Sequence, residues 1–505
     1  MNLTQEQKQI VESSFTSFKI NAVAGSGKTT TLLEYAKRKK DFKILYLAYN
    51  KSLQQSIQKK LANYDIKNMT VSTIHSLAYN RIQAYRYKLC HDLKVQVIEA
   101  VLSNYEQKVN QRASYYPIPE YVALIKDLVN YYCNSSLIDL DLKLIESYKK
   151  HSDLSAKVLE LINKDTSKVL SHLKFILSSM KNKQIDATHD FYLKLFYLNK
   201  KVSSNLGYDL ILVDEAQDIS DVMIGIVEAQ NCNRVYVGDS FQQIYSFRYA
   251  MNALNKIELP AYNLTKSFRF SNAYAKELEK NINILYEQNS SKPLFIRGNE
   301  NSTIFSNSCV NKDKQFTIIA RTTFGLIQEL VHYIHKNKKL YFEGGYGSYS
   351  LMNQTVYSIF YLKEKKNEKI TLDEIKEFET IKELEQFAKD TKNQDYLNII
   401  KFVNTYGDNI FEINNKIKSQ LTLDKKEADI VFTTTHKSKG LEYEQVIMAD
   451  DFITKKDIVN PKSNLSHTKI NEELNIYYVA ATRVKNAIEL SSFKLDYTYK
   501  ESDFI

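Results

Sequence analysis

The residues best suited to chemistry lie in AVAGSGKTT, residues 22–30, which follow an apolar run and precede a helix-like pattern. A glycine-rich turn that opens a helix points backbone N–H groups and the positive helix end at a phosphate group. Lys28 would then reach the β- and γ-phosphates of a nucleotide, and the Thr29 hydroxyl would ligate Mg²⁺. Ala22 replaces the first glycine of the strict pattern, so the segment is a variant phosphate-binding loop. The residues expected to hold the nucleotide here are Ala22, Val23, Ala24, Gly25, Ser26, Gly27, Lys28, Thr29 and Thr30.

A second segment, LILVDEAQD at residues 210–218, has the pattern of a buried strand that ends in two adjacent carboxylates. Asp214 at the strand end can hold Mg²⁺ through water, and Glu215 can orient and deprotonate an attacking water. Taken alone, such a pair is also explained by solvation of a strand end. Together with the phosphate-binding loop, it predicts nucleotide hydrolysis.

A third segment, VGDSFQQIYSFR at residues 237–248, combines an amide with aromatic rings. Gln242 is placed to bridge a γ-phosphate to a nucleic-acid surface. Tyr245, Phe247 and Arg248 offer two rings and a cation on which bases can stack. The same spacing also fits packing in a core. The chain has no Trp, so any stacking surface must use its 36 Tyr and 24 Phe.

The elements that must position these residues are short apolar runs alternating with helical patterns. FKINAVA, KILYLAY, YDLILVDEA and NRVYVGD predict buried strands of a parallel sheet that binds ligands at its carboxyl edge. A long stretch of helical periodicity separates the first two runs from the last two. QFTIIARTT, ADIVFTTTH, YEQVIMAD and AIELSSF predict a second α/β domain, itself interrupted by a charged helical stretch.

Composition sets the outer limits. The chain has 505 residues, of which 43% are hydrophobic and 25% charged, as in a globular protein of several domains. Its formal charge of +10 suits a polyanionic partner, although a lysine-rich surface gives the same balance. The four cysteines lie far apart without a C-x-x-C pair, which argues against a zinc site, an iron–sulfur cluster or a disulfide framework. Without a signal peptide or a membrane-length apolar run, we expect a cytoplasmic protein with no membrane partner.

Seven motifs in order give the chain a family resemblance: AVAGSGKTT, TIHSLAY, LVDEAQD, GDSFQQIYSFR, LTKSFRFS, THKSKGLEYEQV and YYVAATR. In this order and spacing they resemble those of UvrD/Rep-type superfamily 1 DNA helicases. The wordings YLAYNKS, LTKSFRFS and YFEGGY are most similar to the helicase core of F-box DNA helicases, although no F-box segment is expected before the first motif.

The resemblance implies an α/β fold of two RecA-like P-loop motor domains, each with a mainly helical insertion, and ATP bound between the motor domains. The expected limits are 1–80 and 200–250 for the first motor domain (1A), 81–199 for its insertion (1B), 251–335 and 425–505 for the second motor domain (2A), and 336–424 for its short insertion (2B).

The resemblance also implies how ATP is held. Gln7 matches a glutamine that reads the adenine edge, and Phe268 matches an aromatic that stacks on adenine. Arg269 matches an arginine at the γ-phosphate, and Glu442 a glutamate at the ribose. Arg483 corresponds to an arginine finger, and we expect it to face a wet cleft without ATP, so that Arg483→Ala changes stability by at most about 0.5 kcal/mol. The implied catalytic set is Lys28, Glu215, Gln242, Arg269 and Arg483.

Contacts with a single DNA strand are implied for Asn50, Lys51, Thr73, His75, Tyr245, Phe247, Arg248 and His436. The sequence departs from the family pattern at some positions. Thr30 stands where an arginine often packs on the base, and Tyr249 stands where a glycine is usual. Ala48 and Tyr49 shift the aromatic of a strand-contacting motif by one residue.

The implied function is an ATP- and Mg²⁺-dependent DNA helicase or translocase that moves 3′→5′ on single-stranded DNA. Its substrates would be single strands and tailed or forked duplexes, in repair, recombination or replication. Three alternatives remain open from the sequence: a translocase that strips proteins from DNA with little unwinding, the motor subunit of a phage-defence system, and an RNA-dependent ATPase.

Overall fold

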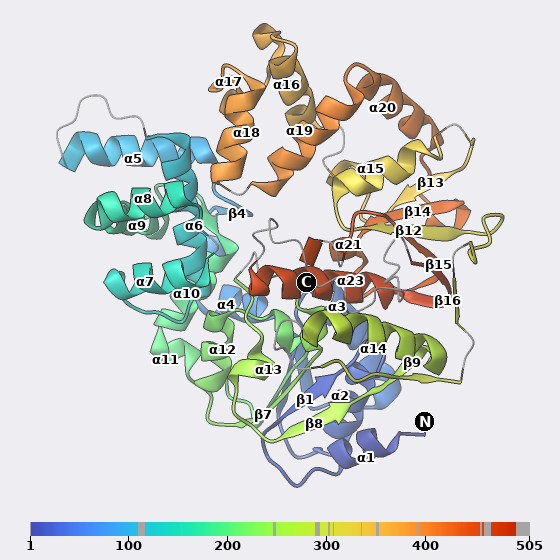
Figure 1. The fold of residues 1–505 in the computed structure, drawn as a ribbon. Helices are drawn as coiled ribbons and strands as arrows, with labels where there is room; N and C mark the ends of the chain where they lie inside the picture. Colours follow the sequence, from blue (N-terminus) through green and yellow to red (C-terminus); the bar gives the residue numbers. More distant parts are fainter. Residues whose placement is uncertain are drawn as a thin grey trace.

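The computed structural model describes residues 2–109, 117–152, 154–245, 249–287, 293–300, 303–306, 308–334, 336–349, 353–391, 393–454, 457–458 and 466–490. Two six-stranded sheets organise the chain, and helices pack around them (Figure 1). All the strand pairs within both sheets are parallel. The α/β class with two RecA-like domains is therefore confirmed.

The first sheet has the strand order β3-β2-β6-β7-β1-β8. Its strands are β1 (Phe18–Ala22), β2 (Ile44–Leu47), β3 (Met69–Ser72), β6 (Leu210–Val213), β7 (Asn233–Gly238) and β8 (Ala261–Leu264). The four predicted apolar runs form its four central strands, and β2 and β6 are buried along their whole length because helices cover both faces. Strand β8 pairs with β1, so the first sheet continues past the expected boundary at residue 250.

A group of helices fills the first interruption. They are α4 (Ile74–Arg81), α5 (Val95–Val109), α6 (Pro119–Asn134), α7 (Leu142–His151), α8 (Ala156–Lys164), α9 (Thr166–Lys181) and α10 (His189–Leu198). Helices α5 to α10 share an apolar core centred on α6 and α9. A short parallel pair, β4 (Leu89–Cys90) with β5 (Ala187–Thr188), ties the entry of this group to its exit.

The second sheet has the order β11-β16-β15-β12-β14-β13. Its strands are β11 (Ile304–Phe305), β12 (Phe316–Ala320), β13 (Leu340–Phe342), β14 (Ile430–Thr434), β15 (Tyr443–Met448) and β16 (Val484–Glu489). Strand β13 lies inside the range expected for the second insertion, but it pairs with β14 and so belongs to the sheet. Helices α14 (Asn272–Glu287) and α23 (His467–Ala481) pack on this domain.

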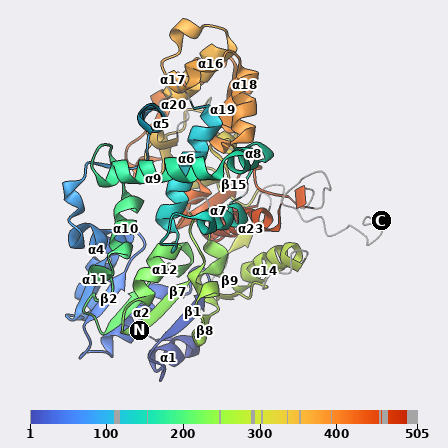
Figure 2. The ribbon, with the colours of Figure 1, turned by 90° about the vertical axis from the view of Figure 1, so that its left-hand side faces the viewer.

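The second insertion is also helical. It contains α16 (Gln354–Lys363), α17 (Asp373–Lys376), α18 (Ile381–Asp390), α19 (Gln394–Tyr406) and α20 (Asn409–Gln420). Helix α18 contacts α6 and α8, so the two insertions meet above the RecA-like domains (Figure 2). In the part of the chain that the structure describes, no helix combines the length and apolar character needed to cross a membrane.

The two RecA-like domains meet along α23, which lies between the two sheets (Figure 1). Helix α23 contacts the single turn η3 (Ser240–Gln242) that follows β7 of the first sheet. The chain crosses from the first domain to the second just after β8, where β9 (Lys266–Ser271) begins and pairs with β10 (Arg297–Asn299). This crossing places β9 beside the phosphate-binding loop.

Candidate active site

The loop between β1 and α2 (Lys28–Lys37) has the backbone of an anion cradle. Gly25 and Gly27 have φ values of 70° and 78°, in the left-handed region that favours glycine. A Cβ atom on Gly25 would lie only 2.9 Å from Cβ of Arg269, so strand β9 also requires a glycine there. The Ser26 hydroxyl is buried without a hydrogen-bond partner among the described residues, as expected of a group left for a ligand.

Four predicted residues come together at the mouth of this loop. Lys28 Nζ lies 2.8 Å from Glu215 Oε1. The Thr29 hydroxyl donates to Asp214 Oδ2 at 3.4 Å, and the Tyr46 hydroxyl donates to the same oxygen at 2.6 Å. The phosphate-binding loop and the carboxylate pair therefore form one site, because β1 and β6 both end at the carboxyl edge of the sheet.

Electrostatics keep this cluster charged. Burial by itself would lower the pKa of Lys28, but the surrounding carboxylates, Glu215 first among them, raise it. Burial would raise the pKa of Glu215, but the positive charges of Lys28 and Lys439 outweigh it and bring the pKa to about 2. Burial and the charge of Glu215 raise the pKa of Asp214. At neutral pH, Lys28 is thus a cation and Glu215 a carboxylate.

The backbone at Glu215 is unusual. Its φ of 54° is left-handed, which costs energy for a residue with a side chain. Gln217 Nε2 donates to Glu215 Oε2 at 2.5 Å and to Asp218 Oδ2 at 3.2 Å. The side chain of Glu215 is therefore held at both oxygens, by Lys28 on one side and Gln217 on the other.

A lysine from the second domain completes the cluster. Lys439 forms a buried ion pair with Asp218 and donates to the Gln242 carbonyl at 2.6 Å. The Gln242 amide, expected at a γ-phosphate, donates instead to Asp239 Oδ2 at 2.6 Å. The segment that follows β7 is thus joined to Asp218, three residues after Glu215, through a residue of the other domain.

Arg269 also reaches the phosphate-binding loop from the second domain, since its Cβ approaches Gly25. Its guanidinium pairs with Glu442 Oε1 at 2.7 Å and donates to the Thr482 carbonyl at 2.5 Å. Burial would raise the pKa of Glu442, but Arg269 lowers it, so the pair is ionised. Arg269 and Glu442, predicted separately from two motifs, are direct partners.

Arg483 differs from the sequence expectation. It is only 1% exposed, and its guanidinium donates to Val479 O at 2.8 Å, Thr482 Oγ1 at 2.9 Å and Leu441 O at 3.3 Å. Burial and the charge of nearby Arg269 lower the pKa of Arg483 to about 9. The prediction of a wet cleft position is wrong, because the Val479 carbonyl near the end of α23, the Leu441 carbonyl and the Thr482 hydroxyl take the guanidinium hydrogen bonds that an anion was expected to accept.

The residues expected around adenine lie side by side. Gln7, in α1 (Gln5–Val11), accepts from Thr4 N at 3.0 Å and donates to Thr31 Oγ1 at 3.2 Å, so both ends of its amide are fixed. A Cβ atom on Gly27 would lie 3.0 Å from Gln7 Nε2 and 3.6 Å from the Phe268 ring. Phe268 is 44% exposed, which leaves a ring face open beside the loop.

Gln7 and Phe268 form one wall beside the loop. Three residues next to this wall were not predicted from the sequence: Glu6, Thr265 and Arg297. Glu6 accepts from Thr265 N at 2.9 Å, from Thr265 Oγ1 at 2.6 Å and from Arg297 Nη2 at 2.6 Å. Thr265 lies at the crossing between the two domains, so Glu6 ties α1 to the start of β9. No local sequence signal marks this contact, since Glu6 and Arg297 are far apart in the chain.

The residues predicted to contact a single DNA strand divide into two groups. Asn50 and Thr73 cap the first turns of α3 (Lys51–Tyr64) and α4, Lys51 is exposed, and His75 lies 3.2 Å from Asp190. Their hydrogen bonds hold two helix starts at the carboxyl edge of the first sheet.

Tyr245 and His436 make contacts across the domain boundary. The Tyr245 hydroxyl donates to the His436 carbonyl at 3.3 Å, and His436 Nε2 lies 3.2 Å from Ile244 O. Tyr49 stacks on Tyr245 with ring centroids 5.8 Å apart. Phe247 and Arg248 lie outside the described residues, and Tyr249 contacts Tyr131 of the first insertion.

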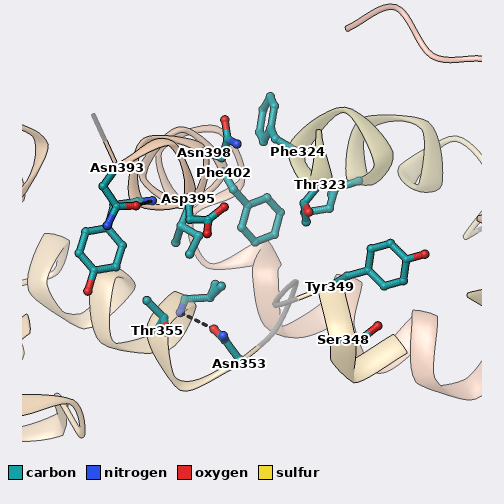
Figure 3. Close-up of a pocket in the computed structure, with 14 residues that line it drawn as sticks. Thr323, Phe324, Ser348, Tyr349, Asn353, Thr355, Asn393, Asp395, Asn398 and Phe402 are labelled. Atoms are coloured by element: carbon teal, nitrogen blue, oxygen red, sulfur yellow. Dashed lines mark hydrogen bonds between the residues drawn. The ribbon is translucent and has the colours of Figure 1, made fainter. Parts of the chain in front are cut away.

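A separate cavity of about 350 Å³ lies between α15 (Thr323–Val331), α16 and α19 (Figure 3). The rings of Phe324, Tyr349 and Phe402 and the amides of Asn353 and Asn393 line it. None of its 14 lining residues belongs to the predicted site, and the Asn353 side chain is engaged in capping α16. The cavity is therefore distinct from the carboxylate and phosphate-loop cluster.

The structure brings the predicted segments together and adds several partners that the motifs did not identify. Tyr46, Gln217, Asp239, Lys439 and Tyr478 all bond directly to predicted residues or to the phosphate-binding loop. Each lies in or beside a quoted motif, so their positions gave a signal. The contacts of Lys439 and Tyr478 depend on how the two domains meet, and that of Tyr46 on how two strands lie side by side, which spacing within one motif does not report.

Comparison with known proteins agrees with the motif order. The sequence profile of the UvrD/REP helicase N-terminal domain matches residues 3–258. The chain is 27% identical to F-box DNA helicase 1 of Gallus gallus, over 97% of this chain and 49% of the relative. It is 29% identical to F-box DNA helicase protein 1 of Schizosaccharomyces pombe, over 97% of this chain and 57% of the relative. The chain thus spans about half the length of these curated relatives.

Proposed function

We propose, since the chain belongs to the UvrD/Rep helicase family, that it is an ATP-driven motor that moves along single-stranded DNA. One observation carries the proposal. The hydrolytic cluster of Lys28, Asp214 and Glu215 belongs to the first domain. From the second domain, Lys439 pairs with Asp218 beside this cluster, and Arg269 lies against Gly25 of the phosphate-binding loop. A site assembled from both domains makes hydrolysis depend on how the domains are arranged, which is what a motor requires.

The residues present fit ATP with Mg²⁺. The left-handed glycines, the buried Ser26 hydroxyl and the cation of Lys28 suit a polyphosphate. The Thr29 hydroxyl and Asp214 offer two oxygen ligands, and Mg²⁺ at nucleotide sites usually takes few protein ligands with phosphate and water. The metal would supply charge neutralisation at the phosphates. Among the described residues no cluster of three or more His, Cys, Asp or Glu is arranged for a metal ion.

Glu215 is the group we assign to orient and deprotonate the attacking water. Beside Lys28 and Lys439 its pKa is about 2, so before ATP binds it is ionised throughout the neutral and mildly acidic range. Its ion pair with Lys28 must loosen when phosphate oxygens take Lys28 as their counter-ion. The arrival of ATP would thus free the base at the moment when it is needed.

Of the two predicted arginines, Arg269 is the better placed to stabilise charge on the γ-phosphate, because it already adjoins Gly25 of the phosphate-binding loop. Arg483 is held by carbonyls of its own domain and shares Thr482 with Arg269. In this proposal, Arg483 acts as a finger only after ATP draws its guanidinium away from those carbonyls.

The names of the relatives support DNA as the strand, and the motif resemblance supports 3′→5′ movement. A strand-displacement assay tests both. We expect ATP-dependent opening of a duplex that carries a 3′ single-stranded tail and none with a 5′ tail. Comparison of ATPase stimulation by single-stranded DNA and RNA completes the test, because greater stimulation by RNA would contradict the choice of DNA.

A further inference from the structure

Tyr478 places one hydroxyl group across the interface between the two motor domains. It lies in α23 of the second domain and is fully buried. Its hydroxyl accepts a hydrogen bond from the Ala24 backbone N–H at 3.0 Å and donates to Asp239 Oδ2 at 3.2 Å. Ala24 lies in the phosphate-binding loop and Asp239 directly follows β7, so both partners belong to the first domain.

Asp239 connects this hydroxyl to the rest of the site. Its carboxylate also accepts from Gln242 Nε2 at 2.6 Å and from Phe241 N at 3.1 Å. Its backbone N–H donates to Gln217 Oε1 at 3.1 Å, and Gln217 in turn holds Glu215. Tyr478 thus contacts the point where the turn η3 and the hydrolytic carboxylate are joined.

Both partners of the Tyr478 hydroxyl are buried away from solvent. Ala24 is 1% exposed and Asp239 is fully buried, and burial raises the pKa of Asp239. A buried backbone N–H without a hydrogen bond is costly, so the Ala24 N–H depends on the Tyr478 hydroxyl. The Asp239 carboxylate keeps its donors from Gln242 and Phe241, but without the hydroxyl it loses its donor from the second domain. Separation of the domains would remove the hydroxyl from both partners at once.

We propose that the Tyr478 hydroxyl is a positioning group that fixes the phosphate-binding loop relative to η3 only while the domains are closed. Tyr245 lies three residues after Gln242 and contacts Tyr49 and His436. A DNA strand bound near Tyr245 would therefore act on the phosphate-binding loop through η3, Asp239 and Tyr478. The inference rests on the proposed motor function and adds to it the residue that transmits strand binding to hydrolysis.

Tyr478→Phe tests this, because it removes one oxygen and keeps the ring. The matched control is Tyr274→Phe, since Tyr274 is also fully buried and its hydroxyl donates to the Ala481 carbonyl at 3.0 Å within the second domain. Wild type and both variants are compared for Tm, ATP KM, and kcat with and without single-stranded DNA. The assays are run well below the lowest Tm, so that all proteins are folded.

For Tyr478→Phe we expect the DNA-stimulated kcat to fall about ten- to a hundredfold, the factor that corresponds to a hydrogen bond to a charged group. KM for ATP should change less than about threefold, since the hydroxyl does not face the nucleotide. Tyr274→Phe should keep its stimulation even if its Tm falls equally. Asp239→Asn replaces one of two accepting oxygens by an NH2 group that faces a donor from Phe241, Gln242 or Tyr478, so it should also lower the DNA-stimulated kcat.

Two results would overturn the inference: stimulation of Tyr478→Phe equal to wild type, or an equal loss of stimulation in Tyr274→Phe. A wild-type protein that hydrolyses ATP without any response to single-stranded DNA would instead contradict the proposed function itself, and the inference with it. The wild-type measurement therefore separates the two failures.

Discussion

At the scale of single residues, the hydrolytic cluster separates binding from chemistry. Lys28→Ala should weaken ATP binding and abolish turnover, because the phosphates lose their counter-ion. Glu215→Gln should bind ATP but cleave it at least about a hundredfold more slowly, because the water loses its base. Nucleotide affinity and single-turnover hydrolysis measure the two effects. Equal loss of affinity in both variants would contradict the separate roles.

The buried guanidinium of Arg483 reverses the stability expectation drawn from the sequence. Its removal leaves the Val479 and Leu441 carbonyls without a charged donor in the interior. We therefore expect Arg483→Ala to lower the free energy of unfolding by about 2–4 kcal/mol. Denaturant unfolding measures this change, and a loss below about 0.5 kcal/mol would show that the side chain is exposed in solution.

The residues found from sequence and those missed differ in one respect. Lys28, Asp214 and Glu215 are specified within short motifs, because the chemistry requires a fixed local spacing at the end of a strand. Arg483 was assigned correctly to a motif but not to its surroundings, since Leu441 approaches it from a remote loop. Burial of a charge depends on tertiary contacts that a motif does not contain.

At the scale of elements, α1, β9 and β10 meet where the chain crosses between the domains. Glu6 of α1 bonds there to Thr265, just before β9, and to Arg297 of β10, and we call this contact the clasp. Glu6→Ala should free the start of β9 and loosen the wall made by Gln7 and Phe268, raising KM for ATP about tenfold with little change in kcat. Arg297→Ala should act in the same direction. Because Arg297 is half exposed, the coupling energy of the pair should be only about 0.5–1 kcal/mol in a double-mutant cycle.

A matched control for the clasp is Lys339→Ala, because Lys339 forms an exposed ion pair with Glu427 in the second domain, away from the crossing. This variant should leave KM unchanged. A tenfold change in kcat rather than KM for Glu6→Ala would contradict a role in holding the nucleotide wall.

The strands show which parts of each sheet could be predicted from apolar runs in the sequence. The apolar runs predicted β1, β2, β6 and β7 of the first sheet and β12, β14, β15 and β16 of the second. The four strands missed in these sheets are β3, β8, β11 and β13, and each lies at an edge. Strands β11 and β13 are short, and β3 and β8 carry polar residues among their apolar ones, so these strands lack the continuous apolar run that marks a central strand. The sequence therefore predicts the centre of each sheet better than its limits.

At the scale of the whole molecule, the insertions and the motor domains form a connected assembly. Helix α18 touches α6 and α8, while Lys439 and Tyr478 join the motor domains below. The order of domains along the chain was predictable because family motifs mark both motor domains. The contact between the insertions was not, since no motif lies in any of these three helices.

Directional movement on a single strand is the central claim, and removal of streptavidin from biotinylated single-stranded DNA measures it without requiring duplex unwinding. With ATP and Mg²⁺, we expect the wild-type protein to release streptavidin from a 5′ biotin and not from a 3′ biotin. Glu215→Gln should release neither, although it binds the same DNA. No ATP-dependent release from either end would contradict the motor, and release only from the 3′ end would contradict its 3′→5′ direction.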